Sequence, residues 1–159
     1  MARSEVVTVR SATREQNAAC FAIAERLPTY FSALGLENLR RDLDVHDVIV
    51  AESAGTIVGF VTVDRKSPAV REISWLAVDP DVHGDGVGSA LVTQAEALVK
   101  QDGASVLEVK TLGASSDATN YDGTRRFYER HGFALLEEID PFPGWEPGNP
   151  CAIYVKAVG

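Results

Sequence analysis

Apolar and polar residues alternate in several short segments of this chain, which is the period-two pattern of half-buried strands. The first such segment, Val6–Arg10 (VVTVR), is rich in β-branched residues and predicts a strand. Apolar residues then recur at helical spacing over Thr13–Arg26, and Pro28 ends this predicted helix because proline lacks the N–H donor and clashes with the preceding turn. A second short helix is expected over Leu36–Leu43.

The pattern returns to period two in the middle of the chain. His46–Glu52 (HDVIVAE) and Thr56–Arg65 (TIVGFVTVDR) read as two strands, and Ser53-Ala54-Gly55 between them predicts a compact hairpin turn. Val70–Val78 (VREISWLAV) is the expected third member of this antiparallel run.

The second half of the chain begins with an amphipathic helix over Gly86–Gln101 and a terminating glycine at Gly103. Its expected inward residues are Leu91, Ala95, Leu98 and Val99, and its outward ones are Gln94, Glu96 and Lys100. Strands are then expected over Ser105–Thr111, Phe133–Glu138 and Cys151–Val158, with a short helix over Gly123–His131 closed by Gly132, and a Pro/Gly-rich loop over Asp140–Pro150.

The resulting order, β α α β β β α β α β β, predicts a mixed α+β fold with a mostly antiparallel central sheet flanked by helices. It departs from the strict βαβ alternation of a doubly wound sheet. A chain of 159 residues without repeats or long linkers is expected to form one domain over residues 1–159.

The segment Leu76–Leu91 (LAVDPDVHGDGVGSAL) concentrates the chemistry, because a strand passes through a glycine-rich turn into a helix. Glycines allow backbone conformations that other residues avoid and permit close approach of a ligand. The first N–H groups of the helix lack intrahelical acceptors and sit at the positive end of its dipole, so the turn is a candidate anion site. A plain tight connection is the alternative interpretation.

Two nucleotide motifs are excluded at this turn. No Gly-Lys-Ser/Thr closes it, as a P-loop requires. The GxGxxG pattern also fails, because Ser89 or Leu91 falls where its third glycine should be. A nucleotide-binding domain is therefore a remote alternative, which would be supported if ATP or NAD protected the fold better than coenzyme A.

The residues His83-Gly84-Asp85-Gly86-Val87-Gly88 resemble the R/Q-x-x-G-x-G/A signature of the GNAT superfamily of N-acetyltransferases. About forty residues later, Arg126–Phe133 (RFYERHGF) is similar to the family's F-Y-x-x-x-G-F block. The preceding strand Glu72–Val78 and the order of elements agree as well, so the resemblance covers nearly the whole chain. One departure is His83, where the family usually has arginine or glutamine.

The resemblance implies acetyl-coenzyme A as co-substrate and a primary amine as acceptor, joined by direct attack of the amine on the thioester. The pantetheine arm would pair with the backbone of Leu76, Ala77 and Val78, and the Leu76 N–H would hold the oxyanion. The residues implied to wrap the pyrophosphate are His83, Gly84, Asp85, Gly86, Val87, Gly88 and Ser89.

Two proton transfers are also implied. Glu72 stands where several family members carry a glutamate base, although a strand carboxylate paired with Arg71 or Arg65 is an equally open interpretation. Tyr128 matches the tyrosine that donates a proton to the departing thiolate, with an aromatic packing role as the alternative. Phe127 and Phe133 are expected to be core residues.

Composition refines this picture. A net charge of −8 argues against a nucleic-acid partner and suits a cationic amine. No apolar run is long enough to span a membrane, and MARSEVVTVR lacks the apolar stretch of a secretory signal, so a cytoplasmic location is expected. Cys20 and Cys151 are expected to be reduced thiols. No His/Cys/Asp cluster has metal spacing, so no metal is expected.

The sequence leaves the acceptor and the oligomeric state open. The first helices (Ala18–Leu43) and the Asp140–Pro150 loop with Trp145 would shape the acceptor pocket, and a homodimer is compatible with the family. His46 and His131 are expected at the surface or as caps. A non-catalytic module that binds or senses acyl-CoA is the alternative function.

Overall fold

The computed structural model describes residues 6–116 and 118–159, and the chain divides into two compact units. The first comprises residues 1–65 and 73–98, and the second residues 66–72 and 99–159. Seven strands follow the order β1-β2-β3-β4-β5-β7-β6. The predicted fold class, a mixed α+β fold with a mostly antiparallel sheet flanked by helices, is confirmed. That residues 1–159 form one domain stays a prediction.

The strands of the first unit lie close to their predicted positions. They are β1 (Val7–Ser11), β2 (Asp47–Ser53), β3 (Thr56–Arg65) and β4 (Val70–Val78), whose first three residues belong to the second unit. β2 pairs antiparallel with β1 and β3. Ala54 (φ 51°) and Gly55 (φ 80°) make the two-residue hairpin turn between β2 and β3, as the primed turn types require.

The helices of the first unit differ more from their predicted bounds. The predicted helix over Thr13–Arg26 begins as the 3₁₀ turn η1 (Arg14–Gln16) and continues as α1 (Asn17–Glu25). Helix α2 (Ala33–Val45) is longer than expected, because the Ser32 hydroxyl caps it by accepting the Gly35 N–H at 3.0 Å. A 3₁₀ turn, η2 (Pro80–Val82), precedes α3 (Val87–Gln101).

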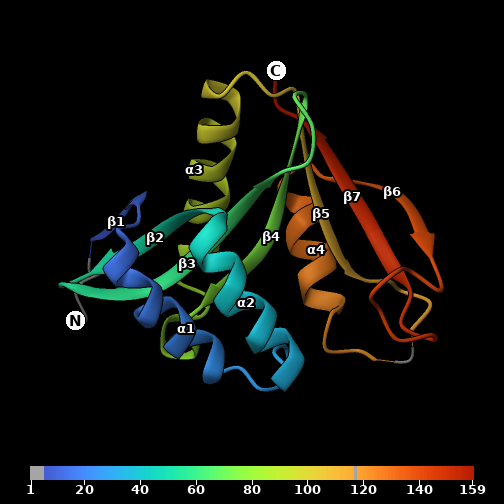
Figure 1. The fold of residues 1–159 in the computed structure, drawn as a ribbon, viewed down its shortest axis with the longest axis horizontal. Coiled ribbons are helices and arrows are strands. Elements are labelled where there is room, and N and C mark those ends of the chain that lie inside the picture. The colour runs from blue at the N-terminus through green and yellow to red at the C-terminus, as the bar shows by residue number, and fades with distance from the viewer. Residues whose placement is uncertain (1–5, 117) are drawn as a thin grey trace. The chain divides into compact units, whose positions relative to one another are not determined.

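Helices α1 and α2 cover one face of the strands in the first unit (Figure 1). The shared apolar core consists of Cys20, Ile23, Ala24, Phe31, Leu39, Leu43, Val50, Phe60 and Ala77. Helix α3 packs on the other face, where β3 carries Gly59 next to Phe60. A Cβ atom at Gly59 would lie 3.1 Å from side-chain atoms of both Val87 and Leu91 and 3.2 Å from the Ala77 carbonyl oxygen. Glycine at this position therefore permits the close approach of α3.

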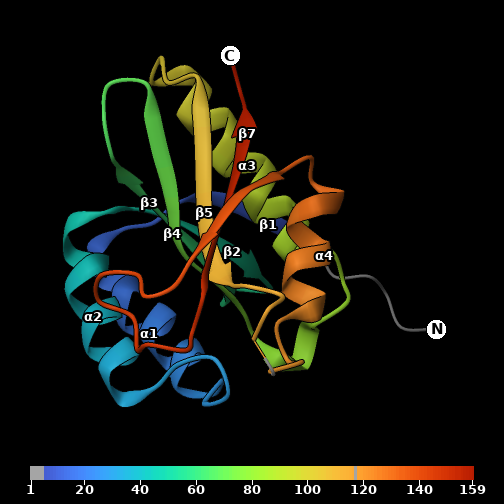
Figure 2. The same cartoon turned by 90° about the vertical axis from the view of Figure 1, so that its right-hand side faces the viewer.

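The second unit contains β5 (Val106–Leu112), α4 (Asp122–Arg130), β6 (Ala134–Ile139) and β7 (Cys151–Ala157). β7 pairs antiparallel with both β5 and β6 (Figure 1), and Figure 2 shows β7 beside β5. Helix α4 lies on one face of these strands. The Tyr154 hydroxyl donates to Glu129 at 3.2 Å, and the Lys156 ammonium donates to the His131 carbonyl at 2.7 Å.

Among the described residues, none of the helices combines the length and the apolar content that a membrane crossing needs. The first ten residues, MARSEVVTVR, were expected to carry no secretory signal. Residues 1–5 of this segment lie outside the described part of the chain.

Candidate active site

The glycine-rich turn has the backbone geometry that the sequence predicted. Gly84 and Gly86 adopt φ values of +89° and +80°, and a Cβ atom at either position would meet nothing within 4 Å. The first helical hydrogen bond of α3 runs from the Ala90 N–H to the Gly86 carbonyl at 3.1 Å. The N–H groups of Val87, Gly88 and Ser89 therefore precede the first intrahelical acceptor. These N–H groups lack intrahelical acceptors and lie at the positive end of the helix dipole, so the start of α3 suits an anion.

The entrance of the turn is fixed by side chains. The Asp79 carboxylate accepts the Asp81 N–H at 2.9 Å and caps η2. Arg26, at the end of α1, forms ion pairs with Asp79 at 2.9 Å and with Asp81 at 3.0 Å. The two carboxylates raise the pKa of Arg26. Sequence reasoning did not identify Arg26, because this contact joins positions more than fifty residues apart.

His83 closes the turn back onto β4. Its Nε2 lies 2.7 Å from the carbonyl oxygen of Val78. A carbonyl only accepts hydrogen bonds, so Nε2 carries the proton and donates it. The imidazole thus occupies a backbone acceptor at the end of the strand, a role that the signature resemblance did not imply.

Strand β4 leads into the turn through Leu76, Ala77 and Val78, of which Ala77 is buried and the other two are half-buried. The regular alternation of the strand is broken just before them. The Ser74 hydroxyl contacts His46 and the Trp75 Nε1–H donates to Asp42, so consecutive residues reach the C-terminal end of the same helix, α2. In a regular strand they would point to opposite faces. The backbone around Leu76 therefore follows an irregular strand segment.

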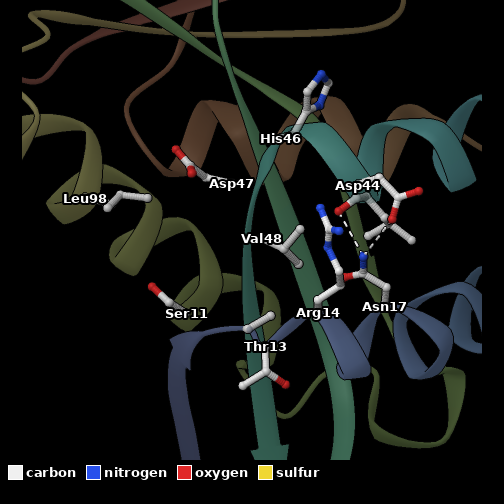
Figure 3. Close-up of a pocket in the computed structure, with 11 residues that line it drawn as sticks. Ser11, Thr13, Arg14, Asn17, Asp44, His46, Asp47, Val48 and Leu98 are labelled. Carbon is white, nitrogen blue, oxygen red and sulfur yellow. Dashed lines mark hydrogen bonds between the residues drawn. The ribbon is translucent and has the colours of Figure 1, made fainter.

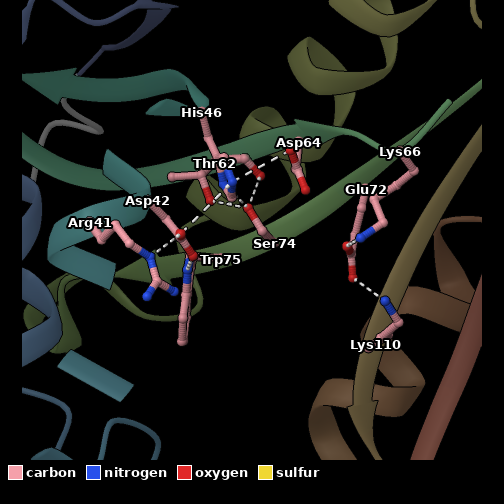
Figure 4. Close-up of polar contacts among 10 residues, drawn as sticks. All are labelled: Arg41, Asp42, His46, Thr62, Asp64, Lys66, Glu72, Ser74, Trp75 and Lys110. Carbon is pink, nitrogen blue, oxygen red and sulfur yellow. Dashed lines mark hydrogen bonds and ion pairs between the residues drawn. The ribbon is translucent and has the colours of Figure 1, made fainter. Parts of the chain in front are cut away.

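Glu72 lies in a charged cluster of the second unit. Its carboxylate contacts the Lys110 ammonium at 3.0 Å and the Lys66 ammonium at 3.3 Å (Figure 4). The predicted partners Arg71 and Arg65 are replaced by these lysines; Arg71 instead donates to the carbonyl of Ser67 at 2.8 Å.

Lys110 also contacts Glu108 at 3.1 Å. Burial acts to lower the pKa of Lys110, but hydrogen bonds and charges from Glu72 and Glu108 raise it overall. The ammonium of Lys110 is consequently held in its charged form within this cluster.

Tyr128 is buried in α4, with 5% of its surface exposed. Its ring makes edge-to-face contacts with Phe127 at 5.3 Å and with Phe133 at 5.5 Å between ring centroids. Burial raises the pKa of Tyr128 well above its ordinary value, so the phenol retains its proton at neutral pH. The packing interpretation and the acid interpretation of this residue are thus compatible.

Tyr128 and Glu72 belong to opposite faces of the sheet in the second unit. Helix α4 contacts Tyr154 and Lys156, which pair with Val109 and Leu107 in β5. Glu72 contacts Lys110, an adjacent residue of β5 that faces the other way. The two predicted proton-transfer residues therefore flank the sheet from its two sides.

His46 belongs to a polar network of the first unit that the sequence did not predict (Figure 4). As expected it caps a helix, α2, but its side chain is only 13% exposed. Its Nδ1 lies 2.9 Å from the Ser74 hydroxyl, and its Nε2 lies 3.5 Å from Asp64 and 3.8 Å from Asp42. The Ser74 hydroxyl also lies 2.7 Å from that of the fully buried Thr62.

A small polar pocket of about 250 Å³ lies in the first unit, and His46 is one of the residues that line it (Figure 3). It is lined by Arg14, Asn17, Asp44 and Leu98 among others, and Asn17 donates to the Leu43 carbonyl and to Asp44. Leu98 is eleven residues beyond Val87 in α3, which corresponds to roughly 16 Å along the helix. The pocket is therefore separate from the glycine-rich turn.

The remaining candidates have mainly structural surroundings. His131 is the C-cap residue of α4, a helix whose N-cap residue is Tyr121. Trp145 packs against Phe142 with ring centroids 6.0 Å apart. Phe133 is a core residue as predicted, whereas Phe127 is half-buried. Within residues 6–116 and 118–159, no group of three or more His, Cys, Asp or Glu side chains is arranged to hold a metal ion.

Comparisons with known proteins agree with this geometry. The sequence profile of the acetyltransferase (GNAT) domain matches residues 44–135. An uncharacterised N-acetyltransferase of Methanocaldococcus jannaschii is 34% identical over 113 residues, covering 67% of this chain and 45% of that protein. The chain thus spans less than half the length of this relative.

Solved structures share the fold. A Desulfovibrio desulfuricans protein assigned to the GNAT family superposes with a TM-score of 0.85 at 21% identity, covering 97% of this chain and 100% of that one. A GNAT acetyltransferase of Elizabethkingia anophelis with acetyl-CoA bound gives 0.72 at 17% identity, covering 95% and 97%. With a family profile that matches more than half of its residues, this chain belongs to the GNAT family of acetyltransferases.

Proposed function

We propose that this chain transfers the acetyl group of acetyl-CoA to a primary amine. The observation that carries the proposal is the start of α3, where Gly84 and Gly86 have positive φ and the N–H groups of Val87–Ser89 precede the first helical acceptor. This backbone offers a diphosphate several donors without a lysine. Family membership supports the same coenzyme.

Coenzyme binding would use two adjacent segments of the first unit. The turn His83–Ser89 would wrap the pyrophosphate, and the backbone of Leu76–Val78 would pair with the pantetheine arm. Because His83 donates to the Val78 carbonyl, this acceptor is already engaged, and pairing would depend mainly on Leu76 and Ala77.

The acetyl transfer would be a direct attack of the neutral amine on the thioester carbon. The Leu76 N–H, in the irregular part of β4, would donate to the oxygen that becomes negative in the tetrahedral intermediate. One well-placed donor of this kind typically contributes about 3–4 kcal/mol to lowering the barrier.

Two charged or ionisable side chains of the second unit would assist the two reactants. Glu72 would attract the cationic amine, which requires the contact with Lys66 or Lys110 to open. Tyr128, protonated and on the opposite face, would donate to the departing thiolate of CoA.

The test is release of CoA thiol from acetyl-CoA in the presence of a small alkylamine, a dipeptide with a free N-terminus, or a lysine side chain. We expect Tyr128→Phe to lower kcat by about 10²-fold with little change in acetyl-CoA affinity. Tyr154→Phe is the matched control, since Tyr154 is also buried in this unit but directs its hydroxyl to Glu129.

The same assay addresses the alternative of an acyl-CoA-sensing module. Thermal stabilisation by CoA without thiol release on any amine would favour sensing and refute transfer. A fully active Tyr128→Phe variant across pH would refute the acid role.

Homodimer formation is also proposed, because the edge strand β6 exposes Leu135 and Leu136 by 53% and 62%.

A further inference from the structure

The polar network around His46 has a defined direction of hydrogen bonding. Ionised carboxylates only accept hydrogen bonds, and the Nε2 atom of His46 faces both Asp42 and Asp64. Nε2 therefore carries the ring proton in the neutral imidazole, and Nδ1 is the acceptor. The hydroxyl of Ser74, 2.9 Å from Nδ1, then donates its proton to His46.

This assignment leaves Ser74 with one unused acceptor position. A hydroxyl has one proton and two lone pairs. The proton has two acceptors within reach, Nδ1 of His46 at 2.9 Å and the Thr62 carbonyl oxygen at 3.4 Å, and the shorter contact is the one to His46. With the Ser74 proton directed to His46, the Thr62 hydroxyl at 2.7 Å is the donor to one lone pair. Thr62 is fully buried, whereas Ser74 is half-buried.

The position of Ser74 along β4 gives this free lone pair a role. Ser74 lies two residues before Leu76, at most roughly 7 Å along the strand, and Leu76 carries the N–H proposed to hold the thioester oxygen. A serine side chain and a substrate amine can bridge that separation. We propose that Ser74 accepts the proton of the acceptor ammonium and that His46 is the final proton acceptor, acting through Ser74. This inference rests on the proposed function.

The proton transfer is balanced as follows. One ammonium N–H bond breaks, its proton moves to the Ser74 oxygen, and the Ser74 proton moves to Nδ1 of His46. The electron pair of the broken bond stays on nitrogen, which then attacks the thioester carbon. The C–S electron pair leaves with the sulfur.

After the transfer, both nitrogens of the His46 ring carry a proton. Asp42 faces it from α2 and Asp64 from β3, while Arg41 lies 3.7 Å from Asp42 and is largely exposed. Glu72 is engaged by two lysines, whereas the Ser74–His46 pair needs no ion pair to open.

The experiment compares His46→Gln and Ser74→Ala with the wild type, using acetyl-CoA and whichever amine of the panel is turned over fastest. We expect kcat to fall by about 10²-fold in both variants, with acetyl-CoA affinity by calorimetry unchanged. Without a proton acceptor only free amine reacts, so variant rates should rise about tenfold per pH unit below the pKa of the amine, while the wild-type rate rises less steeply.

Two variants separate this role from a structural one. Ser74→Thr retains the hydroxyl and should recover most of the rate. His131→Gln makes the same chemical change at the cap of α4 and should leave kcat unchanged.

Several results would overturn the inference. These are a His46→Gln variant with wild-type kcat and pH dependence, a loss confined to Glu72→Gln, or a stable acetyl adduct on Ser74 by mass spectrometry. If the wild type itself releases no thiol although it binds acetyl-CoA, the proposed function fails, and the relay fails with it.

Discussion

Replacing Gly86 by alanine tests whether the backbone conformation of the turn, rather than any side chain, binds the coenzyme. Gly86 has φ +80°, and a Cβ atom there would meet nothing within 4 Å. The substitution therefore introduces no steric overlap with neighbouring residues. Its effect must come from the left-handed backbone region, which costs an L-residue about 1–2 kcal/mol.

The magnitude can be worked out for stability and for binding separately. A cost of about 1–2 kcal/mol should lower Tm by roughly 2–8 °C in a chain of this size. Relief of the strain would rotate the peptide units that start α3 and misalign N–H donors. Hydrogen bonds to charged groups contribute about 1.5–3 kcal/mol each, so losing one should weaken acetyl-CoA binding at least about tenfold.

Gly55→Ala is a closely matched control. Gly55 also has φ +80° and open space within 4 Å of the position that a Cβ atom would take, but it lies in the β2–β3 hairpin. Both variants should lose similar stability by thermal denaturation, and only Gly86→Ala should lose affinity by calorimetry. Equal acetyl-CoA affinity in the two variants would refute the reasoning.

Two further predictions concern stability. Burial raises the pKa of the Cys20 thiol from 9.0 to about 12. Above pH 9.0 the unfolded chain loses the thiol proton while the folded chain keeps it, so the free energy of unfolding is fully present below pH 9.0 and declines as pH rises toward about 12. The decline should be up to about 1.4 kcal/mol per pH unit. Urea unfolding between these pH values should show this decline, with a shallower slope for Cys20→Ala; equal slopes would contradict it. Phe60→Ala, at a fully buried position between β3 and helices α1 and α2, should lower the free energy of unfolding by about 3–5 kcal/mol. Tyr30→Ala, at a position 42% exposed, should change it much less, and similar losses in both would argue against this core.

The elements and the glycine-rich turn were predictable because their signals are local. The bounds of β3 and β4 follow from the alternation of apolar residues, and the hairpin at Ala54-Gly55 follows from its turn residues. The turn at Gly84–Gly88 combines a strand, glycines and a helix within one short segment. Its positive φ angles therefore agree with expectation.

The polar partners were not predictable, because they join distant positions. His46 meets Ser74 across 28 residues, and Lys110 meets Glu72 across 38. Nothing in the local pattern distinguishes the lysine partners of Glu72, Lys66 and Lys110, from Arg71 and Arg65. The irregularity at Ser74-Trp75 was also hidden, since strict alternation assigns the two side chains to opposite faces.

Gly59 gives the coenzyme site a dependence on a buried position. A methyl group there would press on Val87, the first residue of α3, and on the Ala77 carbonyl in β4. These are the two segments proposed to hold the diphosphate and the pantetheine arm. Gly59 itself would touch no part of the coenzyme, yet it sets the spacing between the segments for the diphosphate and for the pantetheine arm. A substitution at Gly59 can therefore lower coenzyme affinity while every residue proposed to contact the coenzyme is unchanged.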